Sequence, residues 1–159
     1  MGDSLTTALL ILHSLLAVAL LGAITHQAIA AVRSGSADGK KTFGSRYRAV
    51  DASAYAGAIV VLFAAASLIG AVLYPSYRMI VRPVLELNDL RVANGTFELK
   101  EHFAAVGLLM LPAYWAAWRK PLAPEHAAAR MSMTWLLAAI VWWNFIVGDV
   151  LNNIRGLSH

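Results

Sequence analysis

The chain has 159 residues, of which 59% are hydrophobic and only 14% charged, and its mean hydropathy is +0.62. Soluble domains carry about a quarter charged residues, so this composition indicates a membrane protein with room for one helical bundle. The absence of cysteine excludes disulfides, thiolate metal sites, iron–sulfur clusters and covalently attached haem c. The net charge of +4 fits basic connectors at an anionic membrane surface, and nucleic-acid binding is not expected.

Four long apolar stretches, separated by charged or Pro/Gly-containing connectors, predict four transmembrane helices. The stretches 5–32 and 52–77 contain no Asp, Glu, Lys or Arg, and each exceeds the roughly 20 residues that cross a ~30 Å hydrocarbon core. The uncharged runs 103–118 and 131–148 are shorter, so these helices must extend into polar sequence to span a membrane. We therefore predict helices at about 5–32, 52–77, 98–119 and 125–154.

The connectors complete the predicted fold, an all-α integral membrane four-helix bundle with up-down-up-down topology that forms a single domain. The second helix is expected to end near Pro75 or to continue, kinked, towards Pro83. Residues 84–97 mix apolar and charged side chains and include Asn94-Gly95, a dipeptide that favours turns. We expect this stretch to be a short interfacial segment between the second and third helices.

The distribution of lysine and arginine predicts the orientation in the membrane. The connectors 33–48 and 119–130 carry eight of the 13 basic residues, and the opposite side carries five. Because basic residues concentrate in cytoplasmic loops, we expect these two connectors in the cytoplasm and both termini outside. A bacterial inner membrane is the expected location.

Several ionisable residues are expected at one depth near the outer surface. At 1.5 Å per residue, His13 lies roughly 8 Å from the midpoint of its helix, and His102 lies roughly 10 Å from the midpoint of the third helix. Extending the third and fourth helices to full spans adds Glu98, Glu101 and Asp149 at the same level. Ionisable groups at this depth are costly unless they are paired, ligated or hydrated, so this cluster is the candidate functional site.

One use of the cluster is binding of haem b. The neutral imidazoles of His13 and His102 would ligate the iron axially, and Arg78 and Arg82 at the membrane edge would bind the propionates. The alternative interpretation is structural: His13 is a hydrogen-bonded buried histidine, and His102 is an interfacial residue at the start of a helix.

A second use is metal binding. Glu98 and His102 are four residues apart on one helical face, Glu101 is adjacent, and His13 and Asp149 would complete a shell of nitrogen and oxygen ligands. This spacing is much less specific than the motifs of zinc hydrolases, and acidic residues at a helix start also counter the positive end of its dipole. A complete proton channel is not expected, because no chain of charged residues runs through the middle of the predicted helices.

The sequence is compatible with three functions. The first is a small redox-associated membrane subunit with one haem b between the first and third helices. The second is a non-catalytic accessory subunit that stabilises a larger membrane complex, and the third is a metal- or proton-handling transporter. No catalytic residue is predicted, so an enzyme is not expected from this chain alone. The expected partners are the lipid bilayer and either other membrane subunits or further copies of this chain.

Overall fold

The computed structural model describes residues 3–32 and 50–157, with side chains for 4–32 and 50–153. Its α-helices are α1 (Asp3–Ala31), α3 (Ala56–Ser76), α4 (Arg82–Leu87), α5 (Arg91–Trp118) and α6 (Ala127–Leu157). Short 3-10 helices precede α3 (η1, Ala52–Tyr55) and α6 (η3, Pro124–His126), and a π-helical turn joins α3 to α4 (η2, Tyr77–Val81). The described residues form no strand, which confirms the all-α prediction.

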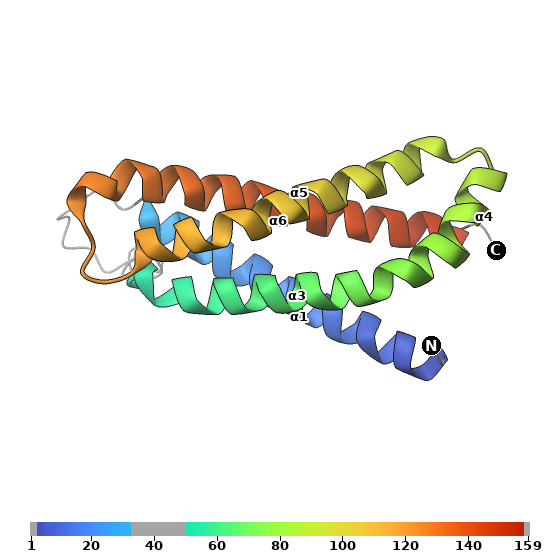
Figure 1. The fold of residues 1–159 in the computed structure, drawn as a ribbon, viewed down its shortest axis with the longest axis horizontal. Coiled ribbons are helices and arrows are strands. Elements are labelled where there is room, and N and C mark those ends of the chain that lie inside the picture. Colours follow the sequence, from blue (N-terminus) through green and yellow to red (C-terminus); the bar gives the residue numbers. More distant parts are fainter. Residues whose placement is uncertain (1–2, 33–49, 158–159) are drawn as a thin grey trace, which may run out of the picture.

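The four long helices run alternately in opposite directions and form a ring (Figure 1). In this ring α1 and α5 each pack on α3 and α6, so α1 and α5 are diagonal neighbours. The start of α1, the α4–α5 turn and the end of α6 lie at one end of the bundle, which we call the terminal end. The end of α1, η1 and η3 lie at the other end, which we call the connector end. The predicted basic connector at 33–48 lies outside the described residues.

Three of the long helices have the length and composition of membrane spans, and they cover Ser4–Ala31, Ala52–Leu87 and Pro124–Asn153. Their outward faces carry large apolar side chains, such as Leu15 and Leu68, which are 63% and 67% exposed. α5 is the fourth long helix, and its hydropathy is lower because its first half contains four charged residues. The prediction of long apolar helices is therefore confirmed for α1, α3 and α6.

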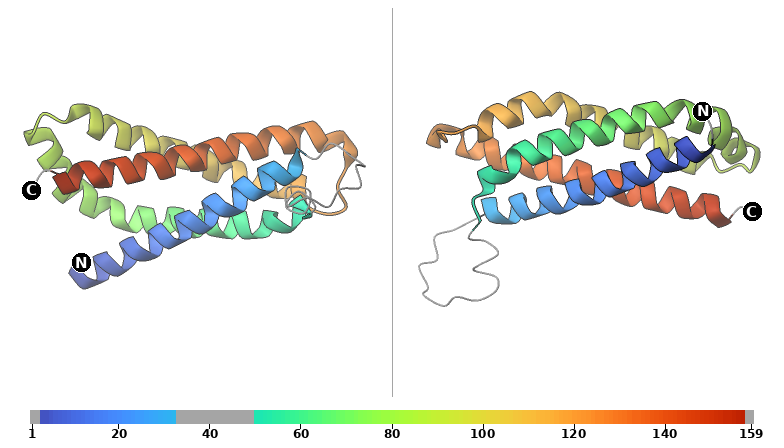
Figure 2. Two further views of the ribbon diagram at one scale, coloured as in Figure 1. Left: turned by 180° about the vertical axis from the view of Figure 1, so that it is seen from behind. Right: turned by 90° about the horizontal axis from the view of Figure 1, so that it is seen from below.

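The core lies in the centre of the ring, where Ile24, Ile59 and Leu137 are completely buried. α5 packs against α3 at Gly107, which is buried against the ring of Phe63. A β-carbon at position 107 would overlap this ring, so glycine makes room for the buried Phe63 side chain between the two helices. Figure 2 shows that the N-terminal half of α1 diverges from the C-terminal half of α6.

The chain between α3 and α5 differs from the predicted interfacial segment, because α3 continues through η2 into α4. In η2 the backbone N–H of Arg82 donates to the carbonyl of Tyr77, five residues earlier. Pro83 has no N–H to offer the carbonyl of Met79, which interrupts the α-helical pattern and favours a π-helical turn. The predicted kinked extension towards Pro83 is therefore present.

The turn before α5 lies at Asp89 rather than at Asn94-Gly95. Asp89 has a φ of 56°, a left-handed conformation that aspartate tolerates better than most residues. α5 begins at Arg91, so Asn94-Gly95 lies inside its first turns, where Asn94 accepts a 3.2 Å hydrogen bond from the hydroxyl of Tyr77. The predicted helix start at about 98 is therefore wrong, and residues 84–97 are helical on both sides of a turn at 88–90.

Replacing Gly107 tests the close approach of α3 and α5. We expect Gly107→Ala to lower the free energy of unfolding by about 1–3 kcal/mol, because the added methyl group forces the buried Phe63 ring to move. Gly148→Ala is the matched control, since a β-carbon there meets nothing within 4 Å and alanine favours a helix by about 1 kcal/mol. Thermal unfolding in detergent measures both, and equal effects of the two variants would contradict this account of the packing.

Candidate functional site

The ionisable residues predicted at one depth all lie in the half of the bundle towards the terminal end, and most of them pair with groups of the protein itself. Arg82 donates from Nε to Glu86 Oε1 at 2.7 Å and from Nη1 to Glu98 Oε1 at 3.0 Å, so it joins α4 to α5. Both ion pairs are partly exposed, with the Arg82 side chain 29% accessible. Glu98 therefore neutralises a cation on the neighbouring helix.

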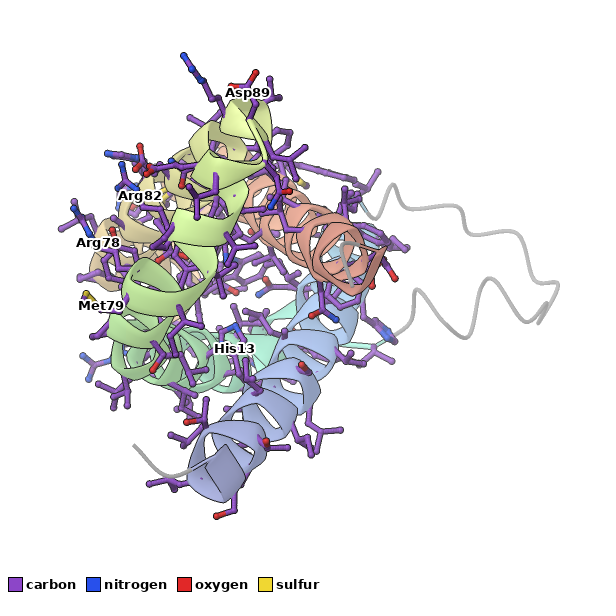
Figure 3. The ribbon with its side chains drawn as sticks, turned by 90° about the vertical axis from the view of Figure 1, so that its right-hand side faces the viewer. His13, Arg78, Met79, Arg82 and Asp89 are labelled. Carbon is purple, nitrogen blue, oxygen red and sulfur yellow. The ribbon has the colours of Figure 1, made fainter. Side chains whose placement is uncertain are left out.

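His13 lies between α1 and α3. Its Nδ1–H donates to the backbone carbonyl of Ala66 at 3.0 Å, and its ring lies beside Gly70, where a β-carbon would be 3.4 Å from the Cε1 atom. Figure 3 shows His13 pointing into the bundle, whereas Arg78 and Arg82 point outwards on the opposite side of α3 and α4. The structure thus separates the predicted imidazole ligand from the arginines predicted to bind propionates.

His102 has different surroundings from His13, because its side chain is exposed on α5. Its Nδ1–H donates to the carbonyl of Glu98 in the same helix at 2.7 Å. Leu109, one heptad further along α5, is 82% exposed, so this face of α5 points away from the ring. In both histidines the carbonyl partner requires the proton on Nδ1, which leaves Nε2 as the acceptor and possible metal ligand.

Lys100 is the inward-facing residue that the sequence interpretation missed. Its side chain is only 15% exposed and forms a 3.1 Å ion pair with Glu101. The ammonium group also lies 4.6 Å from the centre of the Phe97 ring, which in turn stacks on Tyr77. The sequence spacing could have indicated this. Lys100 lies seven residues before Gly107, a buried residue of α5, so the two share one face of the helix.

The predicted metal ligands do not assemble into a metal site. Among the described residues, no group of three or more His, Cys, Asp and Glu side chains is positioned to hold a metal ion. Asp149 is exposed on α6, and Glu98 and Glu101 pair with Arg82 and Lys100. The acidic residues of α5 are therefore placed to balance nearby cations.

A second polar group, which was not predicted, lies in the core towards the connector end. Gln27 and Tyr114 are both completely buried, and the Tyr114 hydroxyl donates to the Gln27 side-chain carbonyl. The Gln27 amide nitrogen donates to the backbone carbonyl of Ala52 at 3.1 Å. Nearby, Trp118 Nε1 donates to Thr134 Oγ1 at 3.0 Å. These bonds join α1, η1, α5 and α6, so this group fixes how the four segments meet.

Comparison with known proteins gives no family for this chain: no family model, curated protein or solved structure matches it. Its function is therefore inferred from geometry and composition.

The buried polar group can be tested by removing one hydroxyl. We expect Tyr114→Phe to lower the free energy of unfolding by about 1–2 kcal/mol, because the Gln27 carbonyl oxygen is left buried without its donor. In the Tyr114→Phe background, Gln27→Met should cost less than it does alone. The control is Tyr74→Phe, which removes an exposed hydroxyl bonded to Arg78. Additive effects of the two changes would contradict a direct interaction.

Proposed function

We propose that this chain is a non-catalytic integral membrane subunit that crosses the bilayer four times, with both termini outside, and binds another membrane protein chain through α6. The three long apolar helices support membrane insertion directly. α5 is antiparallel to α3 and α6 and packs between them, so it must cross with them. The paired charges of its first half lower the cost of placing that half near the membrane surface.

The interior of the bundle supports a structural rather than a catalytic role. No buried side-chain nitrogen or oxygen in the described part of the chain lacks a hydrogen-bond partner. Several of these buried polar groups join one helix to another, as the Gln27–Tyr114 and Trp118–Thr134 bonds do. The buried polar side chains thus stabilise the bundle through their hydrogen bonds.

The observation that carries the proposal is an exposed stripe on α6, which we call the α6 stripe. Its members recur at spacings of three and four residues, the pattern of a helix–helix seam, and all are exposed. They are Trp135, Ala139, Trp142, Ile146, Asp149 and Asn153.

The composition of the α6 stripe favours a protein neighbour over lipid. Trp142 is 44% exposed, and its Nε1 donates to Thr25 Oγ1 of α1 at 3.0 Å, which fixes the orientation of the indole. Tryptophan prefers the membrane interface, yet Trp142 lies in the middle of α6. At the terminal end of the stripe, Asp149 and Asn153 offer hydrogen-bonding groups that hydrocarbon cannot satisfy. A second transmembrane helix would cover the aromatic rings and partner these polar groups.

Photocrosslinking tests this proposal cleanly, because the natural chain contains no cysteine. Ala139→Cys and Ile146→Cys, each labelled with a benzophenone maleimide and irradiated in native membranes, should give a discrete protein adduct. Leu136→Cys is the matched control, since Leu136 is 52% exposed on α6 but lies outside the stripe.

The mass of the adduct identifies the kind of partner. A band at twice the 17.1 kDa of the chain indicates a second copy, and another discrete mass indicates a different subunit. Equal labelling from Leu136→Cys, or the absence of adducts from both stripe variants, would refute the proposal.

A redox subunit with haem b is the second candidate, and one observation favours it. His13 and His102 each donate from Nδ1 to a backbone carbonyl, the arrangement that orients an imidazole for metal ligation through Nε2. Bound haem would supply one-electron transfer. The outward position of His102 weighs against ligation of one iron by both rings, so we rank this function below the accessory role.

A visible spectrum separates the two candidates. Under the second one, detergent-purified protein should show a reduced-minus-oxidised band of haem b that is lost in His13→Ala and in His102→Ala. His126→Ala, at the exposed connector end, should leave the band unchanged. A colourless preparation, or a band that survives both substitutions, would exclude ligation by this pair.

A further inference from the structure

An apolar groove lies between α3 and α5 on the outer surface of the bundle. It has a volume of about 500 Å³, within the range of small-molecule sites. α3 contributes Gly57, Val60 and Val61 to the groove, and α5 contributes Leu108, Pro112 and Trp115. The groove lacks charged side chains among its lining residues, so an acyl chain fits its chemistry.

Glycine and valine residues of α3 line the groove opposite the indole of Trp115 on α5. A β-carbon on Gly57 would lie 3.5 Å from the Trp115 ring, so the indole of α5 lies close to the backbone of α3 at this point. Val61 is 66% exposed and Trp115 is 45% exposed, so the groove opens outwards. In a membrane this opening faces the lipid.

Positive charge lies where the groove reaches the connector end. Leu108, Pro112 and Trp115 follow one face of α5, and Arg119 is the next residue on that face, four positions beyond Trp115. Arg119 is exposed and forms the C-cap position of α5. In the proposed membrane insertion a guanidinium at this helix end would lie near the lipid phosphates, which arginine binds with two parallel hydrogen bonds.

The residue that follows Arg119 forms an ion pair with the start of η1. Lys120 Nζ bonds Asp51 Oδ2 at 2.6 Å, which ties the end of α5 to the start of η1 and holds the pKa of Asp51 at about 2. This pair is therefore fully ionised and mutually neutralised at neutral pH. Among the described residues Arg119 forms no ion pair, so the groove ends beside an exposed guanidinium and a neutral ion pair.

We infer that the α3–α5 groove binds an anionic phospholipid, with one acyl chain lying along Gly57, Val61 and Trp115 and the phosphate on Arg119. The inference rests on the proposed membrane insertion, because only a membrane-spanning chain exposes this groove to lipid. A zwitterionic phospholipid offers the same acyl chains, but its choline group competes with the guanidinium for the phosphate. The site should therefore prefer phosphatidylglycerol over phosphatidylcholine.

Native mass spectrometry of detergent-solubilised protein, titrated with dioleoyl lipids, tests the inference. The natural chain should bind phosphatidylglycerol about fivefold more tightly than phosphatidylcholine, and Arg119→Gln should remove this preference. The matched control is Arg91→Gln, which removes the same charge from a side chain that is 85% exposed at the terminal end. Arg91→Gln should leave the preference unchanged.

A second variant tests the groove itself. Val61→Phe fills the groove from an exposed position, so it should lower phosphatidylglycerol binding without unfolding the bundle. Val72→Phe makes the same change at another exposed position of α3, outside the groove, and should have no effect. Equal binding of the two lipids, equal effects of both arginine variants, or unchanged binding in Val61→Phe would each overturn the inference.

Alkaline extraction of membranes before solubilisation keeps the two proposals distinguishable. A chain released by carbonate would refute membrane insertion itself. A chain that resists carbonate but shows no lipid preference would refute only the lipid site.

Discussion

The packing of α5 into the ring of apolar helices is the constraint on which the rest of the structure depends. α1, α3 and α6 are apolar enough to cross a membrane by themselves, whereas α5 carries charged residues through its first half. Its inward face repeats every seven residues through Ala93, Lys100, Gly107 and Tyr114. Three of these meet different requirements: Gly107 makes room for the Phe63 ring, Tyr114 bonds Gln27, and Lys100 pairs with Glu101. The inward face of α5 therefore joins α5 to both α3 and α1.

The depth of the polar residues along the helices was predictable from the sequence, but the direction in which they face was not. A rise of 1.5 Å per residue places His13, Glu98 and His102 towards one end of the bundle once the apolar runs are known. The direction of a side chain depends on which neighbours a helix has, and α5 turned out to direct Lys100 inwards and His102 outwards. A heptad count from Gly107 would have shown this difference, since a buried glycine marks a close helix contact.

Local sequence patterns also explain which elements could be predicted from the sequence. Uninterrupted apolar runs made α1, α3 and α6 recognisable, because length and composition are local properties. Asn94-Gly95 is a strong turn signal, yet Asn94 bonds Tyr77 and the chain reverses at Asp89 instead. The contact between Asn94 and Tyr77 joins residues from different helices, and such a tertiary contact is not visible in a local pattern. The buried Gln27 was missed for the same reason, because its partners lie on η1 and α5.

The two outward-facing features lie on opposite sides of the ring. The groove is formed by α3 and α5, whereas Trp142 of the α6 stripe bonds α1. Because α3 and α5 are adjacent in the ring, and α6 and α1 are adjacent on its other side, a lipid in the groove and a helix on the stripe would not compete. Binding at these two surfaces is the activity that we propose for the chain. A small subunit of this kind would act by holding a lipid on one side and a protein on the other.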